Sequence, residues 1–139
     1  MTRIDFYVLP SSDLQERLQT SCRLSAKAWQ QGINTFIRCQ DTAQMEQLDA
    51  LLWSYPPERF LPHNRYRDNP HAPIVLGDSI PTLPQPQLLI NLATQIPPEY
   101  GLFERVIEIV VQDPQHLNSA RENFRHYRRC GYDPQRVEL

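Results

Sequence analysis

Basic and aromatic side chains crowd together near the end of this 139-residue chain, before Gly131. The group consists of Arg121, Phe124, Arg125, Tyr127, Arg128 and Arg129. At about 100° per residue, Leu117 and Phe124 fall on the apolar stripe of a helix and the arginines border that stripe. Guanidinium groups donate charge-assisted hydrogen bonds to carboxylates and phosphates. The pattern predicts a receptor for an acidic partner, and the alternative interpretation is a solvated basic face over an ordinary core stripe.

The chain as a whole does not attract polyanions. It carries 14 basic and 16 acidic residues, for a net charge of −2. Any anion binding must therefore be local. Every basic residue except Lys27 is arginine, which favours forked recognition of carboxylates or reflects an arginine-rich genome.

A second group of large side chains lies on a proline-rich segment, where Trp53 and Phe60 flank Pro56 and Pro57. Prolines lower the entropic cost of holding a loop ready for a partner. Buried aromatic side chains are common anchors of protein interfaces. The alternative is that Trp53 and Phe60 close the core of the protein itself, and the two interpretations differ in the exposure of these rings.

The elements that must position these residues alternate between strand and helix in the first half of the chain. The predicted elements are strand 3–9, helix 13–31, strand 34–39, a helix capped by Asp41, strands 73–77, 88–93 and 104–112, and a final helix that starts at Asp113 and Pro114. A β-α-β-α opening is typical of a parallel sheet covered by helices. We expect one domain over residues 1–139, a three-layer α/β/α sandwich with a mostly parallel sheet.

Two details of this fold follow from local signals. The first helix is expected to bury one apolar stripe and to end at Gly32. That stripe comprises Leu14, Leu18, Cys22, Ala26 and Trp29. Ten of the 13 prolines lie between Pro56 and Pro98, so this region is extended or turning, and Pro70–Pro98 is open to an antiparallel edge.

Several functional classes find no support in the sequence. The layout resembles a mononucleotide-binding sheet, but the turn after the first strand lacks glycine and no phosphate-binding motif is present. The three cysteines, Cys22, Cys39 and Cys130, lack metal-ligand spacing, which indicates reduced thiols in a cytoplasmic protein. No segment has the features of an export signal or a membrane span.

The candidates for catalysis are scattered, so we expect no catalytic residue, metal or cofactor. Histidines occur at positions 63, 71, 116 and 126 without a shared nucleophile or base. The enzyme-class alternative is a small nuclease or phosphatase acting at the loop that carries His63 and His71. Such an enzyme would need a metal or a nucleophile and would lose activity when either histidine is replaced by alanine.

Four motifs together resemble the chi subunit of bacterial DNA polymerase III, nearly end to end. They are FYVL at 6–9, LW at 52–53, FLPHN at 60–64 and ENFRHYRRCGY at 122–132. The resemblance implies a non-catalytic subunit of a DNA-directed DNA polymerase, a nucleotidyltransferase complex, that acts at the cytoplasmic replication fork. It also implies a bridge between the psi subunit of the clamp loader and the acidic C-terminal tail of single-stranded-DNA-binding protein.

The resemblance assigns residues to both surfaces. The loop toward psi corresponds to Trp53, Phe60, Pro62 and His63, and a repair helicase is the alternative partner for this loop. The tail surface corresponds to Leu117, Arg121, Phe124, Arg125 and Arg128. A family lysine one turn earlier is replaced here by the stretch 116–118, His-Leu-Asn, and Arg128 or Arg129 is expected to supply that charge. The tail combines several aspartates with a terminal hydrophobic residue and a free carboxylate, and DNA is reached only through the other protein.

Overall fold

The computed structural model describes residues 1–54, 61–66, 68–69, 71–80 and 87–139. Phe60, one of the residues assigned to the psi surface, lies outside the described residues. The elements are β1 (Arg3–Val8), α1 (Gln15–Gln30), β2 (Thr35–Arg38), α2 (Thr42–Ser54), β3 (His63–Arg65), β4 (Ile74–Gly77), β5 (Leu88–Asn91), the 3-10 helix η1 (Pro98–Leu102), β6 (Arg105–Val110), α3 (Pro114–Arg129) and β7 (Gln135–Glu138).

The strands form one seven-stranded sheet in the order β3-β4-β2-β5-β6-β1-β7, and all neighbouring strands run parallel. For the described residues of 70–98, the antiparallel edge considered for this region is therefore wrong. All four residues of β4 and all four of β5 are buried, as expected of interior strands of a parallel sheet that is covered on both faces. The two edge strands, β3 and β7, were not predicted because they are short and mostly polar.

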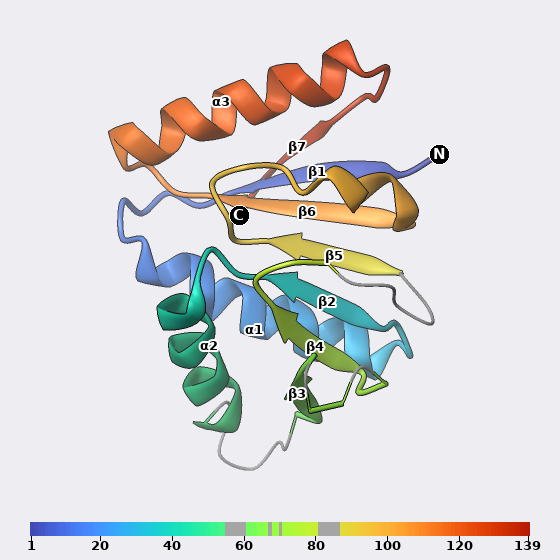
Figure 1. The fold of residues 1–139 in the computed structure, drawn as a ribbon. Helices are drawn as coiled ribbons and strands as arrows, with labels where there is room; N and C mark the ends of the chain where they lie inside the picture. Colours follow the sequence, from blue (N-terminus) through green and yellow to red (C-terminus); the bar gives the residue numbers. More distant parts are fainter. Residues whose placement is uncertain (55–60, 67, 70, 81–86) are drawn as a thin grey trace.

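The predicted three-layer architecture is confirmed. Figure 1 shows α1 and α2 on one face of the sheet and α3 on the other, with η1 on the same side as α3. Each face has its own apolar core: Leu18, Ile37 and Ile90 belong to the α1 side, whereas Phe6, Leu89 and Tyr127 belong to the α3 side. The open sheet thus presents two edges, β3 and β7, far from each other.

The predicted stripe of α1 is only partly correct. Leu18, Cys22 and Ala26 are buried, but Leu14 is 49% exposed and Trp29 is 37% exposed. Leu14 precedes the first residue of the helix and Trp29 lies in its last turn, so the two mispredicted residues stand at opposite ends of α1. Gly32 follows the helix with a φ of +74°, a conformation that glycine adopts without the penalty paid by other residues.

Both ends of α3 match the sequence prediction. The Asp113 carboxylate accepts a hydrogen bond of 3.0 Å from the backbone N–H of His116, and Pro114 occupies the first turn. Gly131 has a φ of +91° just after the helix. These signals fix where α3 starts and ends above β6 and β1.

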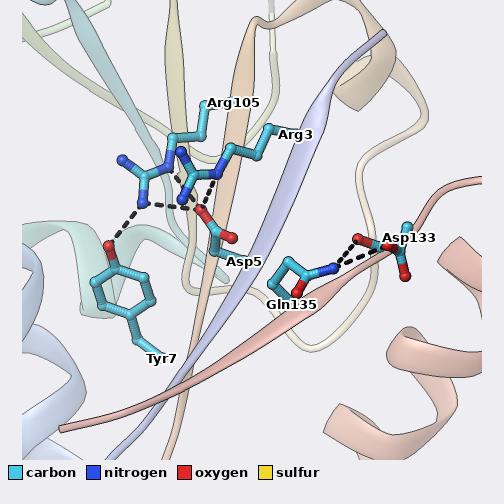
Figure 2. Close-up of polar contacts among 6 residues, drawn as sticks. All are labelled: Arg3, Asp5, Tyr7, Arg105, Asp133 and Gln135. Atoms are coloured by element: carbon cyan, nitrogen blue, oxygen red, sulfur yellow. Dashed lines mark hydrogen bonds and ion pairs between the residues drawn. The ribbon is translucent and has the colours of Figure 1, made fainter.

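A buried carboxylate joins β1 to β6 on the sheet face opposite α3. The Asp5 side chain is fully buried, and its Oδ2 lies 3.0 Å from Arg3 Nε and 2.8 Å from Arg105 Nη2. Arg105 also donates a 2.6 Å hydrogen bond to the Tyr7 hydroxyl, while Gln135 on β7 turns toward Asp133 (Figure 2). Because side chains alternate along a strand, this clamp holds β1 with Phe6 directed to the α3 side.

Two backbone amides near the carboxyl ends of β1 and β6 are paired within the protein. The chain leaves β1 toward α1 and leaves β6 toward α3, so the two connections diverge to opposite faces (Figure 1). Leu9 N–H donates to Val110 O, and Gln112 N–H donates to Ser11 O, each at 2.8 Å. In nucleotide-binding sheets, ligands occupy the crevice beyond such strand ends. Here these two amides already have partners.

Candidate binding groove between helix α3 and the sheet edge

A groove of about 440 Å³ lies between α3 and the strands β1, β6 and β7. Eleven residues line it: Phe6, Val8, Val110, Gln112, Leu117, Ala120, Arg121, Phe124, Arg125, Arg128 and Arg136. The set includes all five residues that the sequence assigned to the tail surface. The structure therefore brings the predicted residues around one cavity.

The floor of the groove is apolar. Phe6 and Val8 come from β1, and Phe124 from α3 packs edge-to-face on Phe6 with ring centroids 5.1 Å apart. Leu117 and Phe124 are only partly buried, so they leave apolar surface open to a ligand. Leu117 and Phe124, which helical spacing placed on one apolar stripe, thus lie together in the groove.

Four arginines line the groove beside this apolar surface. Arg121, Arg125 and Arg128 come from α3, and Arg136 comes from β7. Arg136 was missed because β7 was missed; the only sequence signal was a weak alternation at 135–138, Gln-Arg-Val-Glu. Arg129 lies on α3 but does not line the groove.

The position of the missing family lysine carries no positive charge at neutral pH. Burial, and secondarily the nearby Arg17, lower the pKa of His116 to about 4. The imidazole is therefore neutral above that pH. The positive charge of the groove comes entirely from arginines.

Two of the four arginines already have acidic partners. Arg125 Nη1 lies 2.5 Å from Glu122 Oε1, and Arg136 Nη2 lies 2.7 Å from Glu138 Oε1. Within the described part of the chain, no carboxylate lies within ion-pair distance of Arg121 or Arg128. These two side chains offer guanidinium groups without a charged partner there.

Polar contacts beneath α3 hold it against the sheet. Tyr127 is fully buried, and its hydroxyl donates a 2.8 Å hydrogen bond to Glu108 Oε2, which also accepts 3.0 Å from Asn91 Nδ2. Burial raises the pKa of Glu108 to about 7, and the two hydrogen bonds oppose that rise. On its flank, Asn123 donates to Thr94 O at 3.0 Å. The position of α3, and so the width of the groove, depends on these contacts.

Three of the residues assigned to the psi surface, Trp53, Pro62 and His63, lie at the other edge of the sheet. Trp53 is the next-to-last residue of α2 and has 61% of its surface exposed, so the alternative in which Trp53 closes the core is wrong. Its ring packs on the imidazole of His63 at 4.8 Å. His63 is buried, with Nδ1 2.6 Å from Leu61 O and Nε2 3.2 Å from Asp49 Oδ1. His63 thus supports Trp53 from inside, and Pro62 is partly exposed beside it.

Comparison with known proteins decides the family. The sequence profile of the DNA polymerase III chi subunit, HolC, matches residues 1–135. The chain belongs to this chi family. DNA polymerase III subunit chi of Pseudomonas aeruginosa is 46% identical over 132 residues, covering 95% of this chain and 93% of the relative. The Haemophilus influenzae subunit is 30% identical over 131 residues, with 92% and 91% covered, and the Escherichia coli subunit 29% over 140 residues, with 96% and 95% covered.

Membership makes the chain a replication accessory subunit of DNA polymerase III, which fits a non-catalytic role in a polymerase complex. In the described ranges, no helix is long and apolar enough to cross a membrane, and no three potential metal ligands cluster. Cys22 and Cys39 are buried thiols whose pKa burial raises to about 12, whereas Cys130 is exposed. All three are free.

Proposed function

We propose that this chi-family chain is an adaptor that joins the clamp loader, through psi, to the acidic C-terminal tail of single-stranded-DNA-binding protein. The observation that carries the proposal is the groove under α3, where an apolar floor is lined by four arginines. This combination suits a peptide that ends in a hydrophobic residue and carries several carboxylates. An apolar ligand alone would not need the arginines.

The two parts of the groove supply different contributions to binding. The floor at Phe6, Val8 and Leu117 accepts the terminal hydrophobic side chain and removes it from water. The arginines hold the carboxylates through charge-assisted hydrogen bonds and attract the tail before contact. Since His116 is neutral, Arg128 and Arg136 replace the charge of the family lysine.

A titration of a labelled tail peptide tests this proposal at low and high salt. Wild type is expected to bind in the micromolar range and to weaken as salt rises. Arg128→Glu reverses a charge inside the groove, whereas Arg129→Glu makes the same change on the next residue of α3, outside the groove. The first variant should lose binding and the second should keep most of it. Equal losses would show that only the overall charge of α3 matters, and absence of wild-type binding at low salt would refute the tail link.

The second half of the proposal concerns the edge at β3. Trp53 is a large exposed aromatic side chain held by the buried His63, which suits an anchor for psi. A repair helicase is the alternative partner of the same surface. Competition between psi and the helicase for wild type, and loss of both by Trp53→Ala, would place both partners on this surface. Independent binding of the two would separate them.

Because β3 and β7 are opposite edges of a seven-stranded sheet, the two proposed partners do not share a surface. An adaptor requires both to bind at once. Mixing psi, the chain and the tail peptide should give a ternary complex in which the affinity for each partner is unchanged by the other.

A further inference from the structure

The four arginines that line the groove form its rim, and two of them are already paired with carboxylates of the protein itself. Glu122 and Glu138 place carboxylates on Arg125 and Arg136, the two arginines that face the groove from its helix side and its strand side. Neither glutamate lines the groove itself. Each glutamate therefore pairs with a groove-lining arginine from a position outside the groove.

We infer that Glu122 and Glu138 are specificity-determining residues, which occupy half of the arginine rim until a partner with several carboxylates displaces them. This inference rests on the proposed function of the groove as a receptor for an acidic tail. It explains why two acidic residues stand beside a groove that is proposed to bind acidic ligands.

The local geometry explains why these pairs form without any ligand. Glu122 precedes Arg125 by three residues on α3, so their side chains share one face of the helix. Glu138 follows Arg136 by two residues on β7, so their side chains point to the same face of the sheet. Both pairs are thus built into single elements and need no tertiary contact.

Exposure makes these pairs easy to exchange. The side chains of Arg125 and Glu122 are 59% and 65% exposed, and those of Arg136 and Glu138 are 65% and 67% exposed. Exposed ion pairs contribute little, corresponding to about a two- to five-fold change in an equilibrium. An incoming carboxylate can therefore replace either glutamate at small cost.

The charges of the rim explain the selection for several carboxylates. Four arginines and two glutamates leave a net charge of +2. A ligand with one carboxylate can pair with Arg121 or Arg128, which have no acidic partner among the described residues. A ligand with more carboxylates gains further contacts only by displacing Glu122 and Glu138.

The first test titrates the tail peptide against Glu122→Gln and Glu138→Gln. Each variant should bind the peptide about two- to five-fold more tightly than wild type. The control is Glu46→Gln, which removes an exposed charge from α2 on the opposite face of the sheet and should leave the affinity unchanged. A weaker complex with either variant would mean that the glutamates hold the arginines ready for the tail, and it would overturn the inference.

A double-mutant cycle separates competition for a particular arginine from a general change of charge. The gain from Glu138→Gln should vanish when Arg136 is already glutamine, and the gain from Glu122→Gln should vanish when Arg125 is. A gain that survives the loss of the paired arginine would show a long-range charge effect and would also overturn the inference.

A second peptide checks the selectivity and keeps the two proposals apart. With asparagines in place of the aspartates, the tail retains one carboxylate, and the two glutamine variants should then give no gain. If wild type does not bind the natural tail, the proposed function fails; the same variants are then titrated with a tetra-aspartate peptide. Tighter binding in both glutamine variants would support the role of the glutamates, and unchanged binding would refute it.

Discussion

The β7 edge and the β3 edge of this chi-family chain build their surfaces in different ways. The groove at β7 combines β1, β6, α3 and β7, whose residues are up to 130 positions apart in the sequence, from Phe6 to Arg136. The Trp53 surface at β3 combines one end of α2 with a strand that begins nine residues after α2 ends. A surface of the first kind depends on how α3 docks on the sheet, whereas the second depends mostly on local structure.

The surfaces also differ in charge. Four arginines line the groove, and its proposed ligand is acidic. At the other edge, the exposed feature is an indole ring supported by an imidazole. Salt screens interactions between exposed charges much more than it affects apolar burial, so binding at the two edges should respond differently to salt and to mutation.

The largest effect should come from removing the side chain that docks α3. Tyr127 is fully buried and packs on Phe6 and Tyr100. Tyr127→Ala should lower the free energy of unfolding by about 3–5 kcal/mol, as large buried aromatic side chains do when truncated. Denaturant unfolding measures the loss, and hydrogen exchange should show α3 opening before α2.

Tyr127→Phe is the matched control, because it keeps the ring and removes only the hydrogen bond to Glu108. It should cost about 1–2 kcal/mol. Equal losses from the two variants would mean that the hydrogen bond, and not the ring, holds α3. Equal opening of α2 and α3 would remove the distinction between the two edges.

The second prediction concerns pH, because the buried Glu108 and the half-buried His116 have opposite linkages to folding. The pKa of Glu108 is raised to about 7, so the folded state binds more protons and stability falls as pH rises from about 4.5 to 7. The pKa of His116 is lowered to about 4, so the unfolded state binds more protons and stability rises between about pH 4 and 6.5. The two slopes have opposite signs where they overlap, between about pH 4.5 and 6.5, so each partly masks the other in wild type.

Replacing one of the two groups should leave the pH dependence of stability that comes from the other. With Glu108→Gln, whose amide oxygen can accept the same two hydrogen bonds, stability should rise with pH between 4 and 6.5. With His116→Gln, stability should fall between about pH 4.5 and 7. Chemical denaturation at several pH values measures both slopes. A flat profile in both variants would show that neither group is linked to folding.

The third prediction is the counterpart at the β3 edge. Trp53→Ala should weaken psi binding by about 2 kcal/mol or more, as expected of an aromatic anchor. It should leave the affinity for the tail peptide and the salt dependence of tail binding unchanged. Calorimetric titration of both partners at two salt concentrations measures this. A change in tail affinity would show that the two edges communicate through the sheet.

The sequence was sufficient for most of the fold and for one wall of the groove. Helical spacing placed Leu117, Phe124 and three arginines on one side of α3, because that information is local. The rest depended on tertiary structure: Arg136 lies on β7, a strand too short and polar to be recognised, and Phe6 reaches the floor only because β1 pairs with both β6 and β7. The exposure of Trp29 and Leu14 was mispredicted for the same reason, since helical periodicity does not tell which turns extend beyond the sheet.

The smallest predicted effect comes from replacing the aspartates that precede α3 and α1. The Asp113 carboxylate accepts a hydrogen bond from the third residue of α3, whereas the Asp13 carboxylate accepts only an exposed 2.9 Å bond from the backbone N–H of Gln15, the first residue of α1. Asp113→Ala should lower the free energy of unfolding by about 1 kcal/mol and weaken tail binding slightly, because Leu117 and Arg121 lie in the next turns. Asp13→Ala, near the start of α1, should cost less and leave tail binding unchanged. Thermal unfolding and the peptide titration measure both, and equal effects on tail binding would mean that the groove does not depend on how α3 begins.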